Sequence, residues 1–184
     1  MKTIFSKLLH ANFDLLPAAV KSFHDVPHLT FTGFANVSGA TNLPAKFIRI
    51  IFDLPRPTAK VTLNLVVWRS ETTERWQSNF AGHTFISSFS TAASNTLLCA
   101  HFGLFRFYFR LSVKEQKLHW QFVRWSIGSF ILPSALGPRI VAHESEGQDG
   151  SYQFFCQVIF PLIGELICHD GQVLPRYKNQ STIK

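Results

Sequence analysis

The chain has 184 residues, of which 46% are hydrophobic and 16% are charged. A charged fraction so far below the ~25% of an average soluble domain argues against disorder, and the apolar excess needs a core, a ligand cavity or an interaction surface. The formal net charge is +7, but no Lys/Arg run appears, which argues against a nucleic-acid-binding arm, although a basic face could still meet anionic lipid or an acidic partner.

The first part of the chain predicts two helices with a strand between them. Apolar residues recur at helical spacing over residues 2–24, with Pro17 as a break or kink. A first strand is predicted over residues 29–37, with glycines at positions 33 and 39. A second helix is expected over residues 43–54, where Asn42 can cap its N-terminus.

From residue 60 onward the periodicity is that of β-strands. The clearest strand covers residues 105–113, where Phe105 and Phe107 alternate with polar side chains. In the strand after it, the apolar positions change parity between Phe122 and Val123, which predicts a β-bulge. The further predicted strands cover residues 61–69, 75–80, 85–90, 118–127, 139–144, 152–160 and 165–170.

These elements predict an α+β fold in which two N-terminal helices pack on a strongly curved sheet of about eight strands. The sheet must be mainly antiparallel, because short turns join the strands without helical crossovers. A sheet of this size curls into a half-barrel or a barrel-like form, and the sequence leaves that choice open. A single β-rich domain is expected over residues 1–175, followed by a flexible C-terminal tail at 176–184.

Cysteine use and the apolar pattern predict a cytoplasmic protein. Cys99, Cys156 and Cys168 make an odd count without metal-binding or redox spacing, and they are expected to be buried, reduced thiols. The apolar start of the chain is broken from His10 onward and shows no clear cleavage site. No run approaches the ~20 apolar residues that a membrane-spanning helix needs.

Several short patterns occur along the chain in a recognisable order. They are Leu9-His10, His24-Asp25, Gly33-Phe34-Ala35-Asn36-Val37-Ser38-Gly39, Glu74-Arg75-Trp76, Phe80, Phe85, Ser87, His101-Phe102-Gly103, Gly128, Pro133, Pro138, His143-Glu144 and Phe160-Pro161-Leu162-Ile163-Gly164. In this order and spacing, the chain resembles the bacterial family called domain of unknown function 4166 from residue 8 to residue 175.

The resemblance implies a protein partner but no particular reaction. Members of that family occur alone or fused to saccharopine-dehydrogenase-like, NAD(P)-binding reductases, which implies a reductase partner for this chain. The family has no assigned reaction or catalytic residues that could be transferred. This chain contains no glycine-rich dinucleotide loop of its own, and no cofactor is expected.

Glu144 is the strongest polar candidate for a site. It ends a predicted strand and shares a face with apolar neighbours. Facing inward beside Arg75, Arg106 or Arg124, it would be a binding or acid/base group; the alternative is a salt bridge that fixes strand register. The eight histidines show no ligand spacing with carboxylates or thiols, so neither a metal nor a catalytic residue is assigned.

The remaining candidates are mostly apolar. Residues 76–105 contain no Asp, Glu, Lys or Arg, so they could line an apolar cavity or form interior strands of a two-faced sheet. The connector at 128–138 is apolar for a loop, and Phe130, Ile131 and Leu132 in it would gate a pocket or touch a membrane surface. The candidate ligand-binding residues are Arg75, Trp76, Phe85, His101, Phe107, Trp125 and Glu144.

Three functions fit a sequence that lacks the residue pattern of an enzyme class. The first is a non-enzymatic module that binds an apolar or lipid-like small molecule in the cavity of the curved sheet. The second is an accessory protein–protein module that docks on an NAD(P)-dependent reductase or a membrane enzyme. An exposed apolar patch together with the absence of an internal cavity would favour this function. The third is an enzyme of unknown chemistry that uses Glu144 with a nearby histidine.

Overall fold

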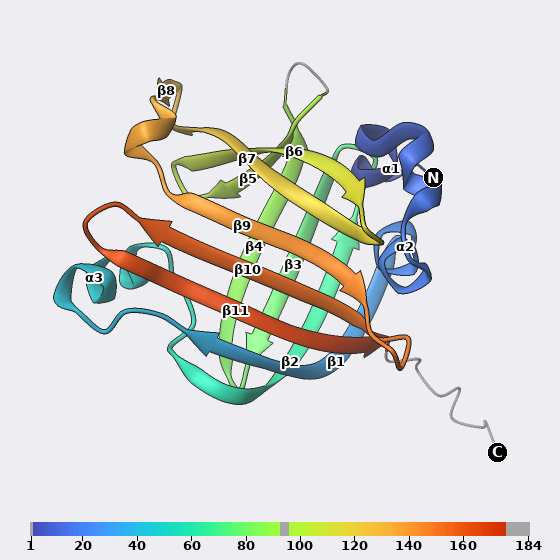
Figure 1. The fold of residues 1–184 in the computed structure, drawn as a ribbon, viewed down its shortest axis with the longest axis horizontal. Helices are drawn as coiled ribbons and strands as arrows, with labels where there is room; N and C mark the ends of the chain where they lie inside the picture. Colours follow the sequence, from blue (N-terminus) through green and yellow to red (C-terminus); the bar gives the residue numbers. More distant parts are fainter. Residues whose placement is uncertain (1, 93–95, 176–184) are drawn as a thin grey trace.

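The computed structural model describes residues 2–92 and 96–175, and its central feature is a closed barrel of antiparallel strands (Figure 1). The helical segments are α1 (Ile4–Leu9), η1 (His10–Leu15), α2 (Ala18–Asp25), α3 (Leu43–Ile51) and η2 (Ser134–Leu136). The strands are β1 (His28–Ser38), β2 (Thr58–Arg69), β3 (Thr73–Phe80), β4 (His83–Thr91), β5 (Leu98–Phe102), β6 (Phe105–Lys114), β7 (Lys117–Ile127), β8 (Phe130–Leu132), β9 (Arg139–Glu146), β10 (Tyr152–Phe160) and β11 (Gly164–Pro175).

Ten of these strands form the closed wall. Neighbours pair antiparallel in the order β6-β5-β4-β3-β2-β1-β11-β10-β9-β7, and β6 pairs with β7 to close the ring, while the short β8 adds to the edge of β7. The predicted antiparallel α+β fold is confirmed in its barrel-like form. The prediction of about eight strands is too low, because the described residues form eleven. The two strands that periodicity missed are β5 and β8, which are only 5 and 3 residues long.

Helices lie at the two ends of the barrel, with α1 and α2 at one end and α3 at the other (Figure 1). The single helix predicted over residues 2–24 is interrupted: η1 separates α1 from α2, and α2 starts only after Pro17, which has no N–H to continue a helix. The second predicted helix is confirmed as α3. Asn42 caps it as expected, because its Oδ1 accepts a hydrogen bond from the N–H of Ala45 at 2.9 Å, although the helix ends at Ile51.

The first and last strands meet in a close β1–β11 seam. A Cβ atom added at Gly33 would lie 1.9 Å from the carbonyl oxygen of Gln172, and one added at Gly171 would lie 2.4 Å from that of Phe34. Both positions therefore need glycine for the two backbones to approach. The bulge predicted beside Val123 is also confirmed, since the register between β6 and β7 shifts there by one residue.

The helices α1 and α2 seal their end of the barrel with apolar side chains. Phe5, Val20 and Phe23 are fully buried there. The ring of Phe23 stacks on Tyr152 of β10, with the ring centroids 3.9 Å apart. This packing holds α2 directly above the polar groups at that end of the interior.

The described barrel ends with β11 at Pro175. The flexible tail predicted at 176–184 lies outside the described residues. Among the helices of the described ranges, none has the length and apolarity needed to cross a bilayer.

Candidate functional site

The barrel encloses a cavity of about 210 Å³. Strand alternation creates it, because every second side chain of each strand points inward. Among the described residues that line it there is no Lys and no Arg. The wall is mostly aromatic and aliphatic and includes Phe52, Leu54, Pro55, Leu63, Leu65, Trp76, Phe80, Phe85, Phe89, Phe102, Phe107, Phe109, Trp120, Ile140, Ala142, Phe154, Val158 and Phe160.

Glu144 supplies the carboxylate of this wall. It lies on β9 after Ile140 and Ala142, which face the same cavity at the same two-residue spacing, and it is only 4% exposed. The Nε2 of His24 donates a hydrogen bond to Glu144 Oε2 at 2.6 Å, and the Nε1–H of Trp120 donates to Oε1 at 3.0 Å. Both carboxylate oxygens are therefore held by fixed donors from α2 and β7.

A second buried carboxylate lies beside the first. Arg69 Nη2 contacts Glu74 Oε1 at 2.9 Å, and the Nε1–H of Trp76 donates to the same oxygen at 2.6 Å. This oxygen also lies 3.9 Å from Nδ1 of His24, so His24 stands between the two carboxylates. We refer to His24, Arg69, Glu74 and Glu144 as the buried polar cluster. It lies where α2 covers the barrel.

Tyr152 on β10 presents one of the unpartnered polar groups of the described residues at this end of the barrel, together with Nδ1 of His24 and Oε2 of Glu74. It is 3% exposed, and its hydroxyl forms no hydrogen bond of normal geometry with the described residues, although it lies close to the carboxylate of Glu144. Burial raises the pKa of Tyr152 well above its ordinary value, and Glu144 raises it further through its charge and through the contact with the hydroxyl. The hydroxyl therefore stays protonated at neutral pH and can still donate one hydrogen bond.

Farther along the wall the ionisable groups are neutral. Burial raises the pKa of Cys156 to about 12, with a smaller contribution from Cys168, and burial lowers the pKa of His169 to about 4. Cys156 and His169 are cross-strand partners on β10 and β11, and Nδ1 of His169 has no hydrogen-bond partner in the described part of the chain. Charge facing the cavity is thus concentrated at Glu144.

Four of the predicted ligand-binding residues line the cavity. Trp76, Phe85 and Phe107 contribute aromatic surface from β3, β4 and β6, and Glu144 contributes its carboxylate from β9. The ring of Phe89, which also lines the cavity, lies 4.8 Å from that of Trp76. That these residues bind a ligand stays a prediction.

The other three predicted residues lie elsewhere. Arg75 is exposed on the outer face, because Trp76 beside it points inward and neighbours on a strand point to opposite faces. His101 is also on the outer face, where its Nε2 lies 2.8 Å from the hydroxyl of Ser90. Trp125 is buried but outside the cavity wall, and its indole N–H donates to the carbonyl of Pro133 at 3.1 Å.

The predicted arginine partners of Glu144 are also wrong. Arg106 is exposed and Arg124 packs over the ring of Tyr108 on the outer face of the barrel, 4.7 Å from its centroid. Glu144 instead contacts His24 of α2, and the periodicity of the strands gives no sign of this contact.

The predicted gate residues form a strand rather than a loop. Phe130 and Ile131 are 79% and 62% exposed on β8, while Leu132 is half-buried and pairs with Trp125. None of the three lines the cavity. They lie at the α3 end of the barrel (Figure 1), and their role as a gate stays a prediction.

The sequence reasoning missed His24, Glu74 and Tyr152. Alternation of Tyr152 with Phe154 and Cys156 on one strand face could have placed Tyr152 inside. Glu74 could have been placed inside in the same way, since it stands two residues before Trp76 on β3. His24 carries no such signal, because it lies on a helix and meets Glu74 across a long stretch of chain.

The described residues hold no group of three or more His, Cys, Asp or Glu side chains placed to bind a metal ion. The three cysteines are free. The prediction of buried thiols holds for Cys99, which is fully buried, and for the thiol of Cys156, which faces the interior, whereas Cys168 is half-buried. Burial raises the pKa of Cys99, which keeps its thiol protonated and poorly nucleophilic.

Comparison with known proteins gives a family. The family described as Domain of unknown function (DUF4166) matches residues 16–173, which include all of the buried polar cluster and every strand of the barrel except the last two residues of β11. No curated protein matches the chain. Because the match covers most of the chain, the protein belongs to the family Domain of unknown function (DUF4166).

Proposed function

We propose that this domain is a binding module that holds an apolar, lipid-like small molecule inside the barrel, with one polar group of the ligand at Tyr152 and Glu144. The observation that carries the proposal is the cavity of about 210 Å³, walled by aromatic and aliphatic side chains and polar at one end. Ligand sites of small-molecule carriers combine a mostly apolar wall with a few polar groups that fix orientation.

The polar end of the ligand is expected to be uncharged. A carboxylate or phosphate placed beside Glu144 would meet a like charge, and no Lys or Arg of the described wall could neutralise it. The hydroxyl of Tyr152 can instead donate to a carbonyl, amide or alcohol oxygen. This chemistry favours a neutral lipid-like molecule over a free fatty acid.

The size of the cavity favours a slender or small ligand. Its volume of about 210 Å³ is below the ~300–1,000 Å³ of pockets that hold drug-sized molecules. Phe52, Phe85, Phe102 and Phe160 line the wall near α3, since Phe52 directly follows that helix and Phe102 contacts Phe52 and Phe85. Rotation of these rings would lengthen the available space.

The two alternative functions are supported less well. A docking module without a cavity is disfavoured by the cavity itself. An enzyme using Glu144 with a histidine finds support only in the contact between Glu144 and His24, and the same hydrogen bonds also serve to fix the carboxylate in place. The reductase partner, like cytoplasmic location, stays a prediction.

The proposal is tested first by native mass spectrometry of protein purified without detergent. We expect a stoichiometric mass above that of the polypeptide, which disappears when the protein is denatured. The released compound should ionise as a neutral lipid-like molecule rather than as a fatty acid. A bare polypeptide mass from several preparations would count against a tight carrier.

Tyr152→Phe is expected to act on stability and on binding in opposite directions. In the ligand-free protein the hydroxyl is buried without a well-formed hydrogen bond, which lowers stability. Its removal should therefore raise the free energy of unfolding by about 1 kcal/mol. The same change should weaken ligand binding about tenfold, because the ligand loses a hydrogen bond. Urea unfolding of ligand-free protein and ligand titration measure the two effects.

The matched control is Tyr108→Phe, since Tyr108 lies on the outer face beside Arg124. This variant should leave ligand binding unchanged. If Tyr152→Phe instead destabilised the ligand-free protein, the hydroxyl would be bound within the protein, and its role as a ligand anchor would be refuted.

A further inference from the structure

The end of the barrel opposite α1 and α2 exposes large apolar side chains from four separate segments. We call these nine residues the rim: Leu43, Phe47, Ile50 and Ile51 of α3, Leu104 of the β5–β6 turn, Phe130, Ile131 and Leu136 of β8 and η2, and Leu162 of the β10–β11 turn. Each is at least half exposed, from 52% at Ile51 to 107% at Leu162. Figure 1 shows these segments together at one end of the barrel.

Helix α3 presents the reverse of the usual amphipathic arrangement. It buries Ala45 and Arg49 toward the barrel, and Arg49 donates a hydrogen bond to the carbonyl of Leu166 at 2.7 Å. A surface helix normally turns its apolar stripe to the core. Here the stripe that includes Phe47 and Ile50, 65% and 78% exposed, faces solvent. Such a surface needs an apolar phase or partner to cover it.

Contacts link three of the four rim segments, and the fourth is held by the pairing of β8 with the end of β7. The amide of Asn42 at the start of α3 donates to the carbonyl of Ile163 in the β10–β11 turn at 3.1 Å. The ring of Phe52, just after α3, lies 4.7 Å from that of Phe105 at the start of β6. The rim is therefore a property of the folded end and not of one loop.

The cavity reaches this same end. Its wall includes Phe52, Leu54 and Pro55, which follow α3 directly, and Phe102 and Phe160, which end β5 and β10. A surface that covers the rim would therefore also cover the apolar end of the cavity.

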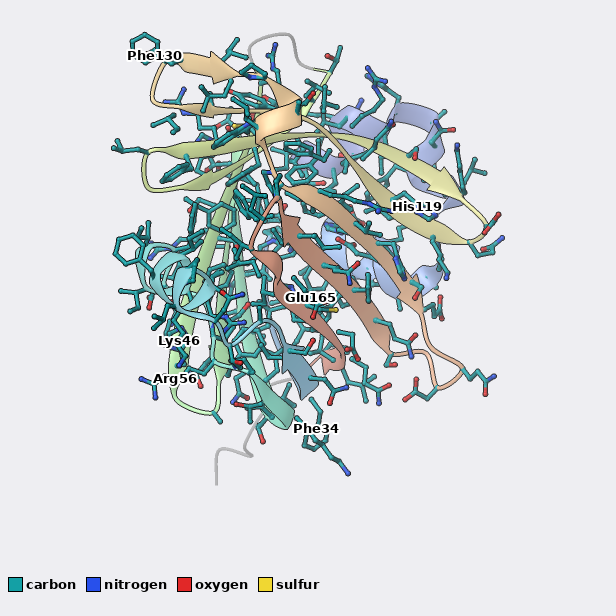
Figure 2. All side chains as sticks on the ribbon, turned by 60° about the vertical axis from the view of Figure 1, so that its left-hand side comes forward. Phe34, Lys46, Arg56, His119, Phe130 and Glu165 are labelled. Atoms are coloured by element: carbon teal, nitrogen blue, oxygen red, sulfur yellow. The ribbon has the colours of Figure 1, made fainter. Side chains whose placement is uncertain are left out.

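The charges around the rim are mostly positive. Lys46, Arg56, Arg106 and Arg139 are exposed on the segments of this end, whereas the acids on them among the described residues are the exposed Asp53 and the half-buried Glu165. Figure 2 shows Lys46 and Arg56 beside α3 on the side of the molecule that also carries Phe130. At the opposite end, exposed Lys and acidic residues are mixed, as in the pair Lys21–Asp14.

From these features we infer that the rim docks on an anionic lipid bilayer, so that the domain takes up or delivers its ligand there. Exposed aromatic and aliphatic side chains enter the headgroup–acyl boundary, and the surrounding cations meet anionic headgroups. A second copy fits less well, because a two-fold contact would bring the same cations together. The inference rests on the proposed function for its purpose, but the docking can be measured separately.

Sedimentation with lipid vesicles tests the docking. The full chain is mixed with vesicles of phosphatidylcholine alone or of phosphatidylcholine with phosphatidylserine. We expect binding to the phosphatidylserine vesicles that weakens as salt is raised. The double variant Phe47→Ser/Ile50→Ser should lower this binding at least about tenfold, because two apolar side chains no longer enter the bilayer.

Two further variants separate the parts of the rim. Phe130→Ser/Ile131→Ser should give a similar loss from a different segment, and Lys46→Glu/Arg56→Glu should weaken binding by about fivefold or more for each charge. The matched control is Phe34→Ser. Phe34 is 51% exposed on the outer wall of β1 (Figure 2), so its loss should leave vesicle binding unchanged.

The results distinguish a lipid bilayer from a protein partner or a second copy as the surface that covers the rim. Absence of binding to both kinds of vesicle would overturn the inference and leave the rim to a protein partner. So would an equal loss in Phe34→Ser, or a dimer in sedimentation velocity that Phe47→Ser/Ile50→Ser dissolves. Native mass spectrometry of the same samples keeps the two proposals apart: vesicle binding by a protein without ligand would refute only the carrier function, and ligand without vesicle binding only the docking.

Discussion

Replacing Glu74 with Gln is expected to lower the free energy of unfolding by about 3–5 kcal/mol, since it removes the counter-charge of a fully buried arginine. The side chains of Arg69 and Glu74 are 0% and 1% exposed, and they face each other across the β2–β3 pair. Breaking such a pair is costly because the remaining charge stays out of water without compensation.

Arg69 also links the barrel to α2, so the loss of stability in Glu74→Gln should extend to the packing of this helix. Its guanidinium donates hydrogen bonds to the carbonyls of Phe23 and Val26, both at 2.5 Å. These carbonyls belong to the last turn of α2 and the residue after it. An unpaired Arg69 that moves toward water would therefore release the helix that carries His24.

The control for Glu74→Gln is Asp14→Asn. Asp14 pairs with Lys21 at 2.5 Å, but these side chains are 76% and 38% exposed, so its loss should cost less than about 1 kcal/mol. Urea unfolding followed by tryptophan fluorescence measures both variants. A Glu74→Gln variant within about 1 kcal/mol of the wild type would refute the structural role given to the pair.

The buried polar cluster also explains why Glu144 is suited to orient a ligand. His24 and Trp120 fix the carboxylate, and the stacked ring of Phe5, 3.7 Å from that of His24, fixes the histidine in turn. A group held in this way is preorganised, so little ordering entropy is lost when a ligand binds beside it. The cluster thereby contributes to both stability and binding.

Much of the fold could be predicted from local patterns. The two-residue alternation of Phe105 and Phe107 and the parity change at Val123 identify β6, β7 and the bulge between them. Closure of the barrel has no such signal, because besides the local pairing of β6 with β7 it needs β1 to pair with β11 across the length of the chain. Gly33 and Gly171 mark that seam only once the two strands are placed side by side.

The sequence predicts which side chains of one strand face the cavity, but it does not predict contacts between residues of two different elements. Glu144 is on the inward face of β9, as its apolar neighbours indicate. Arg75 and Trp76 could not both face a cavity on a regular strand, and the structure turns Arg75 outward. The partner of Glu144 is His24, which lies 120 residues earlier on a helix and follows another periodicity.

The position of the polar groups gives the cavity a direction. Glu144 and Tyr152 lie where α2 closes the barrel, whereas Phe52 and Phe160 lie toward the α3 end with its exposed apolar rim. A ligand that enters from the α3 end would bury its polar group first and its apolar part last. This order would suit a molecule taken from a lipid surface with its polar group reoriented into the protein.

Ala142→Phe is expected to abolish ligand binding and gives the sharpest test of where the ligand sits. Ala142 lines the cavity on β9 between Ile140 and Glu144. A phenyl ring there would occupy much of the 210 Å³ volume and displace ligand contacts, which should lower the affinity by about a hundredfold or more. Because the ring enters existing space, the free energy of unfolding should change by less than about 2 kcal/mol.

The matched control is Val141→Phe, one residue away on the same strand. Val141 is 38% exposed and does not line the cavity, so the added ring points away from the interior. Native mass spectrometry should find the bound mass in Val141→Phe and in the wild type, and none in Ala142→Phe. Full occupancy in Ala142→Phe would move the ligand out of the barrel, and the exposed rim around α3 would then be the place to look for it.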